Sequence, residues 1–348
     1  MYDIRFRRFD PSLRTTFAQA KELALAQTEV PILTAGTLQT EEREGGRFVY
    51  RYRYDALGKR VTEYLGAEST DETREKVDAA RAEIADKETL GRYSLDLRKL
   101  GFYGADNSTA VTVSALFNAG VFGGGAILIG THAFGAILNE LGVAASPFPF
   151  TEDIDVARAD RLQIATLPRG GMLELLNQTG LRFCEVPALR RSQPATSYRV
   201  RGRKLSVDLL VPARGMPYQA VPVPELGTHA TGLPQLRYLL EGASPSVLLA
   251  RDRIVPIVVP NAGRFCVHKL AVYSLRGGGH SAKRDKDVRQ AALLAAILVD
   301  GEDFLLREAI GEVSTLLRRH TKHGARRAIE LLIEDDHPEA AEVLGKLA

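Results

Sequence analysis

Two aspartates flank a single isoleucine in the triplet Asp153-Ile154-Asp155. It lies in a strand-like segment, 152–157. On a β-strand, residues i and i+2 project from the same face, so both carboxylates point at one spot while Ile154 enters the core. Two neighbouring carboxylates repel each other unless a cation neutralises them, and Mg²⁺ chelation is the commonest reason for such a pair. The triplet therefore predicts a cation site on the face of a sheet.

A third acid, Asp208, interrupts the otherwise apolar strand-like segment 205–211. A buried carboxylate without a partner is unfavourable, so we expect a charged group close to Asp208. If this strand lies beside the Asp153–Asp155 strand, three carboxylates converge. Such a cluster can hold two metal ions about 3.5–4 Å apart.

A glycine junction precedes these acids. The apolar run 126–129 is typical of a core strand, Gly130-Thr131 closes it, and a helix is predicted over 131–141. The unpaired N–H groups of the first helical turn suit a triphosphate. Gly125 and Gly130 have P-loop spacing, but Thr131 and His132 replace the required Lys and Ser/Thr, which excludes a Walker site.

In this order, Ile129-Gly130-Thr131, Asp153-Ile154-Asp155 and Asp208 resemble the signature of the DNA polymerase β nucleotidyltransferase superfamily. The resemblance covers roughly residues 105–300 and is strongest to bacterial proteins near the abortive-infection and minimal nucleotidyltransferase toxins. Those proteins continue with a Lys-Leu helix, an Arg and a Lys-Asp pair. The corresponding residues here are Lys269-Leu270, Arg276 and Lys286-Asp287.

The resemblance implies a two-metal Mg²⁺ site with an NTP as substrate. Asp153, Asp155 and Asp208 would hold the metals, and Asp208 would help to deprotonate the attacking hydroxyl. Gly130 and Thr131 would cradle the triphosphate, and the predicted cationic contacts are Lys269, Arg276 and Lys286. The acceptor oxygen would attack the α-phosphorus in line, and pyrophosphate would leave.

Simpler interpretations of the same residues exist. An Asp-x-Asp pair can serve solubility, Thr131 can be a plain helix N-cap, and Lys269 can be a solvated lysine. The group Lys283, Lys286 and Asp287 can be an exposed charged face. His132, His268 and His280 lack ligand-like spacing, so a histidine metal cluster is not expected.

Three units are predicted, in an α+β fold: a helix/β-hairpin/helix extension at 1–104, a polymerase β-like core with a mixed sheet and helices at 105–260, and a C-terminal helical domain at 261–348. Expected helices span 12–27, 70–100, 109–118, 131–141, 261–276, 284–299, 303–319 and 325–347. A hairpin is expected over 47–54 and 59–65, with further strands at 126–129, 152–157, 182–187, 197–201, 205–211, 247–251 and 254–260.

The charge distribution says more than the net charge of +3. Residues 158–204 hold ten basic side chains against the three acids Asp160, Glu174 and Glu185. The basic ones are Arg158, Arg161, Arg169, Arg182, Arg190, Arg191, Arg199, Arg201, Arg203 and Lys204. We expect this segment to line or border the cleft and to bind a polyanionic acceptor such as RNA. The alternative is pairing with the acidic stretch 72–78 of the same molecule.

The longest apolar run, 291–299, is too short to span a membrane, and two cysteines argue against a disulfide framework. A cytoplasmic protein is expected. The leading hypothesis is nucleotidyl transfer to an RNA (tRNA-like) acceptor. Transfer to a protein or small molecule, and a non-catalytic nucleotide- or RNA-binding module of a toxin-type system, stay open.

Overall fold

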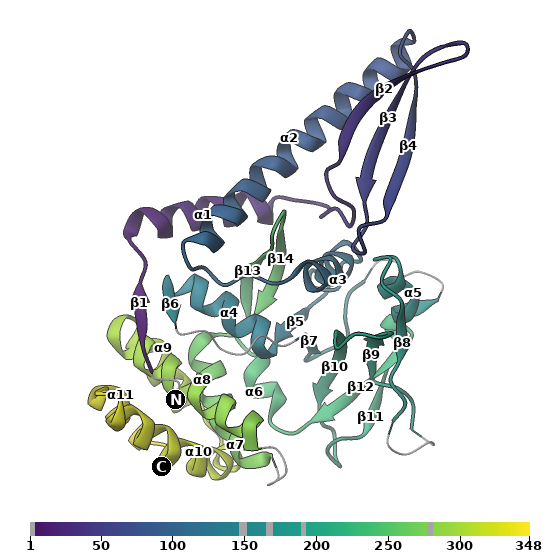
Figure 1. Cartoon of the computed structure of the whole chain (residues 1–348). Coiled ribbons are helices and arrows are strands. Elements are labelled where there is room, and N and C mark those ends of the chain that lie inside the picture. Colours follow the sequence, from purple (N-terminus) through teal and green to yellow (C-terminus); the bar gives the residue numbers. More distant parts are fainter. Residues whose placement is uncertain (1–3, 146–151, 165–169, 189–192, 277–280) are drawn as a thin grey trace.

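The computed structural model describes residues 4–145, 152–164, 170–188, 193–276 and 281–348. An arm projects from a body that contains a mixed sheet, and a group of helices lies beside both termini (Figure 1). The predicted α+β class with a mixed sheet and a helical C-terminal region is confirmed. Within the described part of the chain, no helix combines the length and the apolar character needed to cross a membrane.

The arm consists of a three-stranded antiparallel sheet and one long helix. Its elements are β2 (Thr37–Arg43), β3 (Gly46–Tyr54), β4 (Arg60–Ala67) and α2 (Asp71–Lys99). The predicted hairpin is therefore confirmed, as is the helix expected over 70–100. The helix begins where the Thr70 side chain accepts a hydrogen bond from the backbone N–H of Thr73, with acidic residues in its first turn and basic residues in its last.

Strand β2 was not predicted. Its sequence is mostly polar, and none of its seven residues is buried, so it lacks the alternation that marks a half-buried strand. Glu44 and Gly45 form the turn into β3, and both Gly45 and the first residue of β3, Gly46, have positive φ. Pairing with β3, rather than its own pattern, makes this segment a strand.

Helix α1 (Pro11–Leu25) connects the arm to the body. Asp10 caps its first turn, and Phe17, Ala20 and Ala24 are buried on its inner face. That face packs on the antiparallel hairpin of β13 (Ser244–Leu249) and β14 (Ile254–Val259). Before α1, the short strand β1 (Phe6–Arg8) pairs with β6 (Val143–Ala145).

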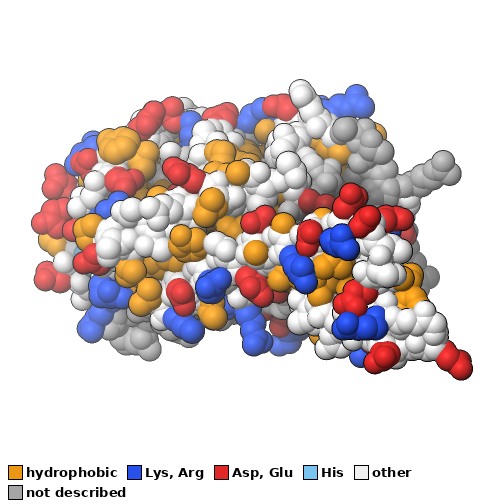
Figure 2. Space-filling model, turned by 90° about the horizontal axis from the view of Figure 1, so that it is seen from above, with side chains coloured by type: hydrophobic (Ala, Val, Ile, Leu, Met, Phe, Trp, Pro, Cys, Tyr) orange, Lys and Arg blue, Asp and Glu red, His pale blue; other side chains and the backbone are white. Residues whose placement is uncertain are grey.

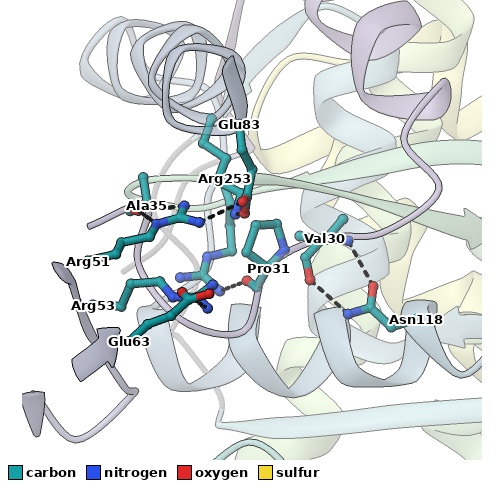
Figure 3. A network of polar contacts seen from close by, with 10 residues as sticks. Val30, Pro31, Ala35, Arg51, Arg53, Glu63, Glu83, Asn118 and Arg253 are labelled. Carbon is teal, nitrogen blue, oxygen red and sulfur yellow. Dashed lines mark hydrogen bonds and ion pairs between the residues drawn. The ribbon is translucent and has the colours of Figure 1, made fainter. Parts of the chain in front are cut away.

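The chain between α1 and β2 is tied to the body by polar contacts (Figure 3). Backbone atoms of Val30 exchange two 2.8 Å hydrogen bonds with the Asn118 side chain. The Arg253 guanidinium donates to the carbonyl of Pro31 at 2.6 Å. These contacts fix the base of the arm on the body. This base, called the root of the arm below, comprises the chain from Val30 to Ala35 and the side chains of Arg51, Arg53 and Arg253 that lie against it.

The central sheet has the strand order β11-β12-β10-β7-β5, with β9 pairing with β10 and β8 with β9. The strands are β5 (Ala126–Ile129), β7 (Asp153–Arg158), β8 (Phe183–Glu185), β9 (Ser197–Val200), β10 (Ser206–Pro212), β11 (Ala220–Val223) and β12 (Thr228–Leu233). Neighbours β7, β10 and β12 run parallel, whereas β5 is antiparallel to β7. The mixed sheet is thus built from the predicted acid-bearing strands at its centre.

Several short elements were not predicted: β1, β2, β6, β11, β12, a 3₁₀ turn (Pro224–Leu226), α5 (Gly171–Asn177) and α6 (Leu236–Leu240). Strand β12 contains Thr228, His229, Thr231 and Gly232, a composition that indicates no strand by itself. Helices α3 (Asn107–Asn118) and α4 (Gly130–Glu140) match the predicted ones and are buried along most of their length.

The C-terminal region is helical as predicted, but two predicted helices have wrong bounds. Its helices are α7 (Ala262–Leu275), α8 (Ser281–Gly301), α9 (Asp303–Gly311), α10 (Thr315–Glu334) and α11 (Pro338–Gly345). The helix expected over 303–319 breaks after Gly311, and Ser314 caps α10. The helix expected over 325–347 is interrupted at Asp336, which has φ 63°, just before Pro338. The apolar pattern continues across both breaks, so the cap residues decided the bounds.

Candidate active site

The three aspartates lie on one face of the central sheet. In the parallel β7–β10 pair, Asp208 is opposite Asp155 and Ser206 is opposite Asp153. Opposite residues in a pair and residues two apart on a strand share a face, so the three carboxylates face the same side. All three line one cavity of about 460 Å³. The strand pairing on which the sequence argument depended is therefore present.

The negative charges of the three carboxylates repel one another. Burial, together with the charges of Asp208 and Asp153, raises the pKa of Asp155 to about 7, while Lys269 opposes the rise. Burial also raises the pKa of Asp208, and a hydrogen bond from Ser197 partly offsets it. Asp153 accepts a 2.8 Å hydrogen bond from the Ser206 hydroxyl. An uncompensated cluster of this kind attracts a cation.

At Gly130 the main chain lies against the carboxylate of Asp155. Strand β5 places Ile129 opposite Asp155, and α4 begins at the next residue. Gly130 has φ +74°, and a Cβ atom there would collide with Oδ2 of Asp155. Both facts require glycine. The junction therefore allows the backbone to approach the Asp155 carboxylate more closely than any side-chain-bearing residue could.

Thr131 follows in the first turn of α4 and is buried. The N-cap of this helix is Ile129, which makes no side-chain capping bond, so the N-cap interpretation of Thr131 is wrong. Its hydroxyl instead accepts a 2.6 Å hydrogen bond from Nζ of Lys286. Burial lowers the pKa of Lys286 to about 8, and the Lys269 charge adds to that effect.

Helices α7 and α8 supply the opposite wall of the cavity. Asp287, whose side chain is 3% exposed, binds Nζ of Lys269 and Nε of Arg276, each at 2.7 Å. Although burial opposes ionisation, these two cations hold the pKa of Asp287 below its ordinary value. The view of Asp287 as part of an exposed charged face is therefore wrong, as is that of Lys269 as a solvated lysine. Only Lys283 of the group is fully exposed.

All eight residues predicted for the site line this one cavity, together with residues that the sequence reasoning did not assign to it. Leu210, Thr231 and Leu233 form an apolar wall from β10 and β12. Leu210 could have been found, because it stands two residues after Asp208 on the same strand face. Thr231 and Leu233 could not, since β12 itself was not predicted.

The basic segment 158–204 lies largely outside the cavity. None of its described side chains belongs to the cavity lining. Arg158 is 3.1 Å from the buried Glu225 carboxylate, and Arg203 donates to Ser108 at the start of α3. Arg199 on β9 is close enough to lower the pKa of Asp208. Arg169, Arg190 and Arg191 lie outside the described residues.

The alternative partner of the basic segment, the acidic stretch 72–78, is engaged elsewhere. Helix α2 pairs its acids with its own bases: Glu72 with Lys76, Asp71 with Arg74 and Asp78 with Arg81. On the face seen from above, acidic and basic side chains are interspersed (Figure 2). The described acids of this helix thus give no support to pairing with the basic segment.

Metal ligands are not preassembled in the described residues, where no group of three or more His, Cys, Asp and Glu side chains forms a metal cluster. Asp153 and Asp208 each hold a serine instead. His132 contacts the Tyr103 hydroxyl at 2.9 Å, and burial lowers the pKa of His268 to about 3. His280 lies outside the described residues.

Comparison with known proteins agrees with this geometry. A family model described as "Nucleotidyltransferase" matches residues 107–315. The match spans the glycine junction, the three aspartates and the cationic wall, and begins after the arm. No curated protein and no solved structure matches the chain. More than half of the sequence is covered, and the chain therefore belongs to this nucleotidyltransferase family.

Proposed function

We propose that this protein is a Mg²⁺-dependent enzyme that transfers NMP from an NTP to an acceptor hydroxyl and releases pyrophosphate. The observation that carries the proposal is the division of charge across the cavity. Three carboxylates line its sheet side, and Lys269, Arg276 and Lys286 line its helical side. A metal–triphosphate complex presents both signs of charge and would match both walls.

The residues fit a metal site. Asp155 and Asp208 have raised pKa values because they are buried beside like charge, which a cation would relieve. The carboxylates line a cavity, and Gly130, which has no side chain, keeps the backbone of the glycine junction close to Asp155. Asp153, Asp155 and Asp208 would hold Mg²⁺, which when bound stabilises the negative charge that develops on the phosphates.

The protein side chains position the substrate. No side chain of the described residues caps the first turn of α4, and the N–H groups at the start of a helix suit phosphate oxygens. Asp287 holds Lys269 and Arg276 in place, and Thr131 holds Lys286. The acceptor oxygen attacks the α-phosphorus, its proton passes to Asp208, and the bond to the β-phosphate oxygen breaks. Pyrophosphate then leaves with the electron pair.

We further propose RNA as the acceptor and a cytoplasmic role like that of the bacterial toxin-related branch. Support comes from the excess of basic side chains in 158–204, of which Arg182, Arg199, Arg201, Arg203 and Lys204 are exposed. The Lys269, Arg276 and Lys286-Asp287 pattern supports the branch. A protein or small-molecule acceptor would keep the same chemistry without needing these charges.

The test is transfer of label from each α-labelled NTP to total RNA in the presence of Mg²⁺. Transfer should vanish in Asp208→Asn and persist in Asp160→Asn, an exposed acid on the body that serves as the matched control. Transfer to no acceptor with any NTP, or full activity of Asp208→Asn, would contradict the proposal. Transfer to protein in place of RNA would overturn the acceptor alone.

A further inference from the structure

We propose that the outer face of the arm's sheet binds single-stranded RNA by stacking bases on its aromatic rings. This face, called the aromatic face below, consists of Phe48, Tyr50, Tyr52, Tyr64, Arg43 and Arg60. It lies before the residues matched by the family model. The inference deepens the proposed function, on which it rests for the identity of the strand as the acceptor.

Strand alternation and register gather these rings. Phe48, Tyr50 and Tyr52 are two residues apart on β3 and share one face, and Tyr64 of β4 is directly opposite Tyr50. The ring centroids of Tyr50 and Tyr64 are 5.4 Å apart, and those of Phe48 and Tyr64 are 6.2 Å apart. The rings of Phe48, Tyr50 and Tyr64 therefore form one continuous surface, and the buried Tyr52 ring lies beside Tyr50 at a centroid distance of 6.4 Å.

The opposite face of the same sheet is already used. Val49 and Leu65 point to that side and form a small core with Ala80 of α2. On the aromatic face, Tyr64 is 57% exposed and Phe48 and Tyr50 are half-buried, whereas Tyr52, 8% exposed, forms the buried end of the row. Exposed rings grouped on a sheet mark an interaction surface, and a tyrosine ring offers a flat apolar face with a polar edge.

Two arginines lie beside the rings, and they favour a partner that carries both negative charge and flat aromatic groups. The Arg43 guanidinium lies 4.9 Å from the Tyr50 ring centroid, and that of Arg60 lies 4.8 Å from the Tyr52 centroid. Rings that stack bases beside cations that meet phosphates are the pattern of single-stranded nucleic-acid binding. Glu41 pairs with Arg43 and accepts a hydrogen bond from Tyr52, so it competes with phosphate for this arginine.

The aromatic face leads toward the basic segment of the body. Asp55, in the turn between β3 and β4, lies beside Gly180, where an added Cβ would be 3.5 Å from its carboxylate. Arg182 follows two residues later and is exposed. The backbone of Arg201 bonds to the carbonyl of Arg182, so both arginines lie at the same edge of the body. A strand bound on the arm would meet these cations as it continues to the body.

The experiment measures binding of a labelled oligouridylate of about 12 nucleotides, a length within the usual range for such sites, by fluorescence anisotropy. The full chain is used without NTP or Mg²⁺. The double substitution Tyr50→Ala with Tyr64→Ala should weaken binding roughly tenfold to hundredfold, because two stacking platforms are lost. Phenylalanine at both positions should bind within about threefold of the parent, since the ring faces remain.

Two further variants sharpen the result. Phe304→Ala removes a 61% exposed ring on α9, far along the chain from the arm, and should leave binding unchanged. Glu41→Gln should tighten binding, because it frees Arg43 for phosphate. Parent-like melting temperatures of the alanine and phenylalanine pairs exclude misfolding as the cause.

Unchanged RNA affinity in the alanine pair would overturn the inference, as would a protein dimer that the same substitutions disperse. The two proposals can fail separately. Intact Mg²⁺-dependent NTP binding with tyrosine-independent RNA binding overturns only the role of the aromatic face. Tyrosine-dependent RNA binding without any NTP binding overturns only the proposed transferase activity.

Discussion

The cleft and the root of the arm both bury charged side chains, but they balance those charges differently. At the root, the Arg51 guanidinium donates to the carbonyl of Ala35 and binds Glu83 at 2.6 Å (Figure 3). Arg253 binds Asp252 and the carbonyl of Pro31, and Arg53 binds Glu63. The guanidinium groups of Arg51 and Arg253 thus meet acceptors supplied by the protein itself.

In the cleft, the sheet side places three acids together, and the side chains that bond Asp153 and Asp208 are serines and not cations. Asp155 faces Asp208 across the strand pair, and the pKa of Asp155 is raised to about 7. The helical side differs again, because one buried acid, Asp287, holds two cations. The cavity therefore has three carboxylates on its sheet side and three cationic side chains on its helical side.

The difference shows that burial of charge does not by itself indicate function. A closed network such as the root fixes one part of the chain against another. A site whose like charges converge stores unfavourable energy, which binding can release. Substitutions in the cleft should therefore change ligand binding or catalysis, whereas substitutions in the Arg51 network should change stability alone.

Asp155→Asn should reduce nucleotidyl transfer by about a thousandfold or more, because a metal-binding charge supplies several kcal/mol in the transition state. The same change should raise the free energy of unfolding of the metal-free protein by about 1 kcal/mol, since it removes repulsion from Asp208. Initial rates and urea titration measure the two effects. If the variant is active, or less stable than the parent, then the acids of the cleft do not form a ligand site whose charges repel one another.

Arg51→Ala should lower the free energy of unfolding by about 2–3 kcal/mol, because it leaves the carbonyl of Ala35 without these donors, while Glu83 keeps its ion pair with Lys87. NTP affinity should not change, since Arg51 lies outside the cavity. Urea titration and calorimetry test these expectations. The control is Arg47→Ala on the same strand, whose exposed ion pair with Glu68 contributes less than about 1 kcal/mol.

Lys269→Ala should weaken NTP binding by about 1.5–3 kcal/mol, the usual contribution of a hydrogen bond to a charged group. The fold should persist, because Asp287 keeps its bond to Arg276. Isothermal calorimetry with Mg²⁺ and each NTP measures the loss. If affinity stays at the parent value, the Lys269–Asp287 pair is a structural network like the one at the root.

Lys283→Ala should have the smallest effect, below about 1 kcal/mol in NTP affinity. Lys283 lines the same cavity but is exposed, so water and salt screen its charge. The effect should shrink further at high ionic strength, as the same calorimetry at two salt concentrations would show. A loss as large as that of Lys269→Ala would mean that burial does not decide which cations matter.

The local parts of the site could be predicted from the order of the residues alone. The alternation around Ile154 set which face two carboxylates share, and the run 126–129 before Gly130 set where a strand meets a helix. Most long helices and the arm's hairpin followed from periodicity and caps. The division of the chain at 104 and 260 stays a prediction, as do the catalytic roles of the site residues.

How these parts meet depends on long-range packing. The register that places Asp208 opposite Asp155 joins residues far apart in the sequence, and no local pattern encodes that pairing. The same holds for Asp287, because its burial and its ion pair with Lys269 depend on how α8 packs on α7. Side-chain periodicity is a property of one element, whereas charge balance is a property of all elements that close around a site. That the three carboxylates on the sheet side of the cavity have no cationic side chain of the described residues bonded to them could therefore be seen only in the folded chain.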